Sequence, residues 1–120
     1  MPIEFEIFPD LRIVLTVLSG AIEDQMCIDN IMRLSDDPRF DSSFDQVIDT
    51  TGISKNGLTE DGLREVAKVT PFISSSRRAF IVAEHVMVTQ ADFYSRLTAG
   101  NSDKVFVTHS RKQAYAWLLD

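Results

Sequence analysis

"AFIVA" (residues 79–83) is the stretch that decides the fold, because all five of its side chains are apolar. Such a run is too short for a buried helix, and its β-branched and aromatic residues favour a strand. A strand that is apolar on both faces is typical of a parallel sheet covered by helices on each side. We therefore expect residues 79–83 to form a central parallel strand of an α/β domain.

Helical patterns lie on both sides of this strand. Before it, apolar side chains recur every three or four residues, which predicts a helix that begins near Thr59 and ends near residues 71–72. After it, residues 87–97 predict another helix, which Gly100-Asn101 would end. The apolar positions of the earlier helix are Leu63, Val66, Ala67 and Thr70.

The first part of the chain predicts two strands and a helix. "IEFEIF" (residues 3–8) alternates apolar residues with glutamate, as an edge strand with one wet face does. "LRIVLTVL" (residues 11–18) is apolar almost throughout and would pair with it as a hairpin, until Ser19-Gly20 ends it. From about Ile22 the spacing becomes helical. The apolar side of that helix would carry Cys27, Ile28, Ile31 and Leu34.

Two more strands and a last helix complete the chain. Val47-Ile48 predicts a short buried strand, and "KVFVT" (residues 104–108) predicts the final one. "HSRKQAYAWLL" (residues 109–119) predicts a helix, and Ser110 with Gln113 matches a capping box at its start. Its buried stripe would hold Ala114, Trp117 and Leu118.

These elements alternate in a way that requires parallel pairing through right-handed crossovers, apart from the initial hairpin. We predict one α/β domain over residues 1–120, with the order ββαβαβαβα. Its sheet would be mixed, mostly parallel and five-stranded, and four helices would cover it. No repeat, linker or low-complexity tract interrupts the pattern.

Composition excludes several classes of protein. The formal net charge of −6 opposes binding to phosphate backbones and anionic lipids, so we expect no nucleic-acid partner. The single Cys27 cannot form an internal disulfide, which fits a reducing, cytoplasmic setting. The acidic start "MPIEFEIF" does not match a signal peptide, and no apolar stretch is long enough to span a membrane.

Several segments of the sequence resemble those of a known family. They are "GAIEDQ" (20–25), "VIDTTGIS" (47–54), "RRAFIVAE" (77–84), "ADFYSRL" (91–97) and "KVFVTHSRKQAYAWL" (104–118). With the order of elements, they resemble the SpoIIAA-like group of STAS domains, and more closely the small bacterial STAS-related proteins with a distant likeness to CRAL-TRIO lipid-transfer domains. The resemblance covers nearly the whole chain. It implies a (βα) superhelix around a mixed sheet, in proteins that act through protein contacts rather than catalysis.

The resemblance also suggests a phosphorylation site. In the anti-sigma-factor antagonists of this group, an Asp-Ser-Ser-Gly turn is phosphorylated on its first serine. The matching residues are Asp49, Thr50, Thr51 and Gly52, so Thr50 inherits the candidate role and Thr51 lies beside it.

The residues that follow favour a structural turn over a switch. Lys55-Asn56-Gly57 separate the candidate hydroxyls from the next helix, whose first turn carries Glu60 and Asp61. Carboxylates there would repel a phosphate by about 0.3 to 1 kcal/mol each. We therefore expect a hydroxyl turn in which Gly52 takes a positive φ and polar side chains bond backbone amides.

A second candidate site is the edge where predicted parallel strands end. Asp49, His85 and His109 each follow such a strand, and ligands of open α/β sheets bind at that edge. Two histidines and a carboxylate could hold a metal or act as acid and base. They come from three separate loops, however, and no nucleophile elbow, phosphate loop or dinucleotide motif is present. We expect no catalytic residue, no metal and no cofactor, and we expect Cys27 to serve in packing.

Three functions remain as hypotheses. The first is a non-enzymatic regulatory or protein-interaction module, with a homodimer and a regulatory protein as expected partners, because four helices would leave part of the sheet uncovered. The second is a carrier or sensor of a small apolar ligand between the sheet and the second and third predicted helices. The third is a metal-dependent or hydrolytic enzyme. Adaptable residues expected near an uncovered surface are Met26, Met32, Met87, Phe93 and Tyr94.

Overall fold

In the computed structural model, which describes residues 2–73, 75–83, 90 and 104–120, a mixed five-stranded sheet has the order β1-β2-β3-β4-β5. The first two strands pair antiparallel and the remaining pairs are parallel, so the predicted hairpin, edge strand and mostly parallel sheet are confirmed. The strands are β1 (Ile3–Phe8), β2 (Ile13–Glu23), β3 (Asp45–Gly57), β4 (Arg78–Ile81) and β5 (Val105–Thr108).

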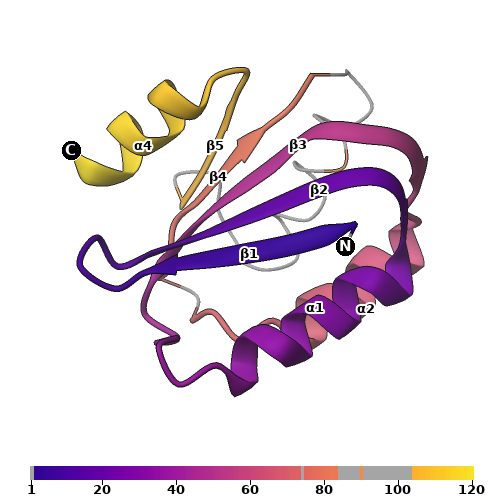
Figure 1. The fold of residues 1–120 in the computed structure, drawn as a ribbon, viewed down its shortest axis with the longest axis horizontal. Coiled ribbons are helices and arrows are strands. Elements are labelled where there is room, and N and C mark those ends of the chain that lie inside the picture. The colour runs from indigo at the N-terminus through magenta and orange to yellow at the C-terminus, as the bar shows by residue number, and fades with distance from the viewer. Residues whose placement is uncertain (1, 74, 84–89, 91–103) are drawn as a thin grey trace.

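Helices cover both faces of this sheet (Figure 1). α1 (Asp24–Asp36) and α2 (Glu60–Val69) lie on one face, and α4 (Arg111–Leu119) lies on the other. We call these the α1/α2 face and the α4 face. The described residues contain three helices instead of the predicted four. The other predicted helix, at 87–97, lies outside the described residues apart from Gln90.

Side chains of successive residues alternate between the two faces, as the pleat of a strand requires. On β3, Val47 packs with Ala114 and Leu118 of α4, whereas Ile48 packs with Leu63 of α2. Cys27 is half-buried against the same cluster as Ile48, so its expected packing role is confirmed. None of the helices among the described residues has the length and apolar character that crossing a membrane requires.

The starts of α1 and α2 are tied together by one carboxylate. Thr59 caps α2, its side chain accepting a hydrogen bond from the Gly62 amide at 2.9 Å, and the helix start predicted near Thr59 is confirmed. The Asp24 carboxylate, in the first turn of α1, accepts from the Thr59 amide at 3.0 Å and from its hydroxyl at 2.6 Å. A Cβ on Gly62 would lie within 2.2 Å of this carboxylate, so a side chain there would displace it.

The capping box predicted for α4 is only half formed. The Ser110 hydroxyl accepts from the Gln113 amide at 3.3 Å, as expected for an N-cap. The Gln113 side chain does not return the bond, because it accepts from the Thr108 hydroxyl at 2.5 Å. The Ser110 amide instead donates to the same Thr108 oxygen at 3.3 Å. The end of β5 therefore supplies the partner that the sequence pattern assigned to Gln113.

β2 and β3 are much longer than predicted, which corrects the interpretation of two segments. Ser19-Gly20 does not end β2: the strand continues to Glu23 through two register shifts, and Gly20 adopts φ 73°. β3 does not end at Ile48, because it pairs with β2 as far as Gly57 (Figure 1). The segment 49–52 is therefore strand and not a turn. The added residues of β2 and those of β3 pair with each other. Neither segment could therefore be predicted as a strand from its own local sequence.

Candidate functional site

Asp49 is locked into the α4 face by three hydrogen bonds. One carboxylate oxygen accepts from the Thr51 amide at 2.9 Å and from the Thr51 hydroxyl at 2.7 Å. The other accepts from Nε of Arg111, at the start of α4, at 2.8 Å. Burial alone would raise the pKa of Asp49, but the bonds from Thr51 and then from Arg111 outweigh it and hold the pKa below its ordinary value. The ionised Asp49 carboxylate therefore links β3 to α4 through Arg111.

The two threonines of the candidate phosphorylation site lie in different environments. Thr50 is only 4% exposed, and its hydroxyl donates to the Ile81 carbonyl at 2.9 Å, whereas Thr51 is exposed. The expectation of a positive φ at Gly52 is wrong, since Gly20 is the glycine with that conformation among the described residues. A Cβ on Gly52 would lie 3.1 Å from the Ser19 Cβ, so close pairing with β2 explains the small residue. A kinase could reach Thr51 but not Thr50 in this conformation.

Two of the three residues of the candidate ligand edge, Asp49 and His109, are among those that the structure describes. His109 is exposed, and its Nδ1 lies 2.5 Å from the Val82 carbonyl, while Asp49 is held by Thr51 and Arg111. His85 lies outside the described residues. Within the described part of the chain, no group of three His, Cys, Asp or Glu side chains is arranged to hold a metal ion.

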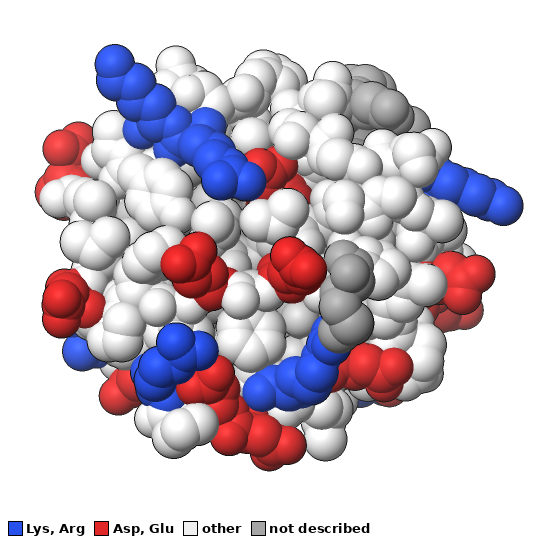
Figure 2. Space-filling model, in the orientation of Figure 1, with Lys and Arg blue, Asp and Glu red and all other residues white. Residues whose placement is uncertain are grey.

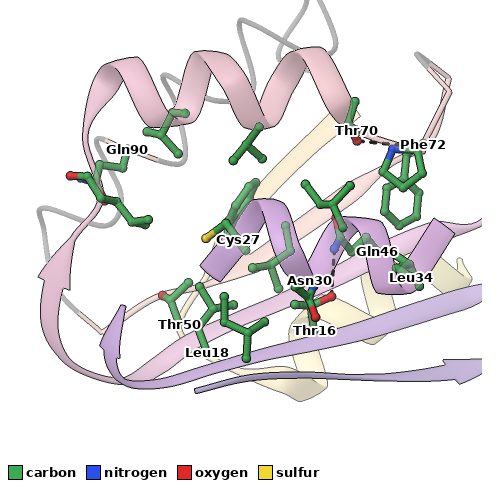
Figure 3. Close-up of a pocket in the computed structure, with 18 residues that line it drawn as sticks. Thr16, Leu18, Cys27, Asn30, Leu34, Gln46, Thr50, Thr70, Phe72 and Gln90 are labelled. Carbon is green, nitrogen blue, oxygen red and sulfur yellow. Dashed lines mark hydrogen bonds between the residues drawn. The ribbon is translucent and has the colours of Figure 1, made fainter. Parts of the chain in front are cut away.

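A cavity of about 100 Å³ lies elsewhere, on the α1/α2 face (Figure 3). Strands β1 to β4 form its floor, α1 and α2 form its walls, and most of its lining is apolar. The residues around it are Ile3, Thr16, Leu18, Cys27, Asn30, Ile31, Leu34, Gln46, Ile48, Thr50, Leu58, Leu63, Val66, Thr70, Pro71, Phe72, Phe80 and Gln90.

The cavity has a small polar corner built from three elements (Figure 3). Gln46 of β3 donates from its side-chain amide to the Thr16 hydroxyl of β2 at 2.9 Å. Asn30 of α1 is 4% exposed and lines the same cavity. Its Oδ1 is buried without a hydrogen-bond partner among the described residues. Buried amide oxygens are almost always bonded, so a water or another small molecule is the expected partner of this one.

Cys27, the only cysteine of the chain, also lines the cavity, and its thiol is unreactive. Burial raises the pKa of the Cys27 thiol to about 12, with a smaller contribution from the negative charge of Asp24. The thiol is therefore protonated near neutral pH and is not a nucleophile. No acidic or basic side chain belongs to the described lining of the cavity. The described part of the lining is therefore uncharged and mostly apolar.

Sequence reasoning missed the polar corner, although a signal was present. Asn30 follows Cys27 by three residues and precedes Leu34 by four, which places it on the buried stripe of α1. Thr16 likewise interrupts the apolar run of β2. Two polar residues at positions that should face a core are the pattern that could have revealed a polar group inside the domain.

Comparison with known proteins supports the architecture. One solved structure, an uncharacterised protein of the DUF3478 family with a SpoIIAA-like fold from Shewanella loihica PV-4, matches with a TM-score of 0.59 and 17% identity. The match covers 97% of this chain and 91% of that one. The chain has a SpoIIAA-like fold. At this level of identity the match establishes the fold alone, and it confirms the fold that the sequence resemblance implied.

No protein-family model matches the chain, and no curated protein matches it. The neighbour with the SpoIIAA-like fold is itself uncharacterised. Evidence for function therefore comes from the residues of this chain, above all from those around the cavity.

Proposed function

We propose that this SpoIIAA-like domain is a non-enzymatic binding module that senses or carries a small apolar ligand. The observation that carries the proposal is the cavity of about 100 Å³ between the sheet and the helices α1 and α2. It is a half-open, mostly apolar hollow between helices and a sheet, and small-molecule sites are typically concave and apolar in this way.

The size of the cavity limits the ligand. An apolar cavity of about 150 Å³ in another protein holds benzene or xenon. The present cavity is somewhat smaller, so a molecule with a single ring or a short chain is the natural occupant, and a whole lipid is too large. The cavity is lined by residues of α1 and α2 and by Gln90. Gln90 is the one residue of the third predicted helix that the structure describes.

The chemistry of the lining supports binding over catalysis. The described lining residues provide no charged side chain, and the Cys27 thiol remains protonated because burial raises its pKa. An apolar surface with few polar groups is typical of ligand-binding pockets.

β3 provides a route by which an occupied cavity could be sensed. Thr50 lines the cavity on the α1/α2 face, whereas Asp49, the residue before it, binds Arg111 on the α4 face. A ligand that displaced Thr50 would shift the same stretch of backbone that positions Asp49. Binding on one face would thus alter the attachment of α4 on the other.

We propose that the sensed state is read by a protein contact, with a second copy of the chain or a regulatory protein. Large apolar side chains between 40% and 56% exposed support such contacts; they are Leu11, Met32, Val69, Ile73 and Leu119. Among the adaptable residues singled out in the sequence, Met32 is exposed and Met26 is half-buried. Met87, Phe93 and Tyr94 lie outside the described residues. The surface in view carries acidic and basic side chains interspersed, without a continuous basic area (Figure 2).

Toluene is a suitable probe for the cavity, because it is apolar and has one ring. Its binding should raise the melting temperature of the wild type, since a ligand at 100 times its Kd stabilises by about 2.7 kcal/mol. Val66→Phe places a larger side chain in the lining and should abolish the effect. Val69→Phe is the matched control, because Val69 lies on the same helix but is 40% exposed and outside the lining.

Native mass spectrometry of freshly purified protein complements the probe. We expect a retained neutral molecule of low mass that is absent from Val66→Phe, and a dimer if the contact surface joins two copies. A wild type that retains nothing and gains no stability from toluene would overturn the proposal. Equal responses of wild type and Val66→Phe would place toluene outside the cavity and count against it equally.

A further inference from the structure

We infer that the ligand is a neutral apolar molecule with one hydroxyl group, which donates a hydrogen bond to Oδ1 of Asn30. The inference rests on the proposed function, because it specifies the ligand class of the same cavity. It is carried by the polar corner of the cavity, where Asn30, Thr16 and Gln46 meet an otherwise apolar lining (Figure 3).

The side-chain oxygen of Asn30 lacks a hydrogen-bond partner among the described residues. Asn30 is only 4% exposed, so this Oδ1 atom is buried without such a partner. The great majority of buried polar atoms in folded proteins are paired, and each exception calls for a missing partner. Because this oxygen can only accept, the missing partner must be a donor.

Thr16 can contribute a second hydrogen bond to a ligand hydroxyl group. Its oxygen already accepts from the Gln46 amide at 2.9 Å. A hydroxyl also carries one proton to donate, and the described residues show no acceptor for it. The corner therefore holds an unpaired acceptor on Asn30 and an unused donor on Thr16. Because Oδ1 of Asn30 is buried, a small shift of the neighbouring side chains would let a ligand hydroxyl, which both donates and accepts, use the two together.

The described lining of the cavity carries no charged side chain, which favours a neutral ligand. No Lys, Arg, His, Asp or Glu is among the described residues that surround the cavity. A carboxylate or an ammonium group placed there would be buried without a counter-charge, at a cost of several kcal/mol. A phenol or a short alcohol avoids this cost, so these are the ligand classes that the cavity fits.

Phenol and toluene form a matched pair of probes, since they differ only by a hydroxyl in place of a methyl group. Their dissociation constants should be measured by calorimetry on the wild type and on Asn30→Leu, which keeps the size of the side chain but removes the acceptor. We expect the wild type to bind phenol at least as tightly as toluene, although toluene gains more on leaving water. In Asn30→Leu, the preference for phenol over toluene should fall by about tenfold or more.

Gln25→Leu is the matched control, because it also replaces an amide on α1 by leucine but at an exposed position outside the cavity. Its preference should equal that of the wild type. If Asn30→Leu fails to fold, the wild type alone tests the inference. Tighter binding of toluene than of phenol would show that the cavity offers no hydrogen bond to the hydroxyl group.

The possible failures are distinguishable. If toluene and phenol both fail to bind the wild type, the cavity is not a ligand site and the proposed function is overturned. If both bind, and the preference is the same in wild type and Asn30→Leu, the proposed function stands and the hydroxyl inference is overturned. The second result is also expected if a permanently bound water occupies the polar corner.

Discussion

The two faces of the sheet treat their polar groups in opposite ways. On the α4 face, Asp49 has a donor for each carboxylate oxygen, and Arg77 donates to the last carbonyls of α4, at 3.4 Å to Trp117 and 2.5 Å to Leu118. On the α1/α2 face, Asn30 leaves a buried oxygen without a partner among the described residues. Full pairing is what a purely structural interface needs, whereas an unfilled acceptor beside a cavity suits a binding site.

Packing follows the same division. On the α4 face the Phe106 and Trp117 rings stack with centroids 5.3 Å apart, and the Arg77 guanidinium lies 5.2 Å from the Trp117 ring centre. The α1/α2 face instead keeps its cavity of about 100 Å³ beneath two helices that Asp24 ties together at their starts. If the proposed function is correct, the α4 face serves mainly to hold the domain together and the α1/α2 face serves to bind the ligand.

Two leucines of similar burial test this comparison most strongly. Leu118 of α4 is 4% exposed in a packed cluster, and Leu63 of α2 is 8% exposed at the cavity. Leu118→Ala should lower the free energy of unfolding by about 3 kcal/mol, because it opens a new void. Leu63→Ala should cost about 2 kcal/mol, because one side of Leu63 already faces empty space. Urea denaturation measures both.

The leucine pair also has a binding readout. Leu63→Ala enlarges the existing cavity, so it should change the affinity for toluene, whereas Leu118→Ala should leave that affinity at its wild-type value. Equal losses of stability, with no difference in toluene binding, would show that the two faces are packed alike and would break the comparison.

Asp49→Asn tests the fully paired side of the comparison. It should lower the free energy of unfolding by about 2 kcal/mol at pH 7, because one oxygen becomes an amide that cannot accept from its donors. The pKa of Asp49 is lower in the folded protein than its ordinary value, so its contribution is present above that value. The contribution is lost as the pH falls through the folded-state pKa.

The difference between wild type and Asp49→Asn should therefore shrink in acid. Denaturant unfolding at pH 7 and in steps down to about pH 3 measures it. A difference that stayed constant over this range would mean that the charge of Asp49 contributes nothing to the attachment of α4.

Asn30→Leu sharpens the comparison from the other side, because removal of a polar group there should stabilise the protein. Without a ligand, the variant loses an unpaired buried oxygen and gains apolar surface, so the free energy of unfolding should rise by about 1 kcal/mol. Thermal unfolding of ligand-free protein measures it, with Gln25→Leu as the exposed control. A loss of stability would identify Asn30 as a structural residue.

The sequence predicted the initial hairpin and the start of α2 well, because these depend on local pattern. Alternation at residues 3–8 and the cap at Thr59 are properties of short segments. The length of β3 was missed for a physical reason. Residues 52–57 include glycine, serine, lysine and asparagine, which favour turns, and they are strand only because residues 19–23 of β2 pair with them.

The cavity was harder to predict than the fold. Asn30 and Thr16 were visible as polar residues within apolar stripes, but the unfilled space results from how α1, α2 and the sheet fit together. Such a fit depends on contacts between residues far apart in the chain, which periodicity does not report. Conversely, the family resemblance drew attention to Thr50 and Asp49, whose side chains the structure places on opposite faces of one strand.

Thr50→Val is expected to have the smallest effect and tests whether the "DTTG" segment is more than a strand. The substitution keeps the shape of the side chain but removes the hydroxyl that donates to the Ile81 carbonyl, so the free energy of unfolding should fall by about 0.5 to 1 kcal/mol. The preference for phenol over toluene should be unchanged, because the Thr50 hydroxyl proton is already donated to the Ile81 carbonyl and the proposed anchor is Asn30. Denaturation and calorimetry on the same sample give both values. A lost preference for phenol would move the polar anchor from α1 to β3, and phosphorylation found on Thr50 rather than on the exposed Thr51 would show that β3 opens in the cell.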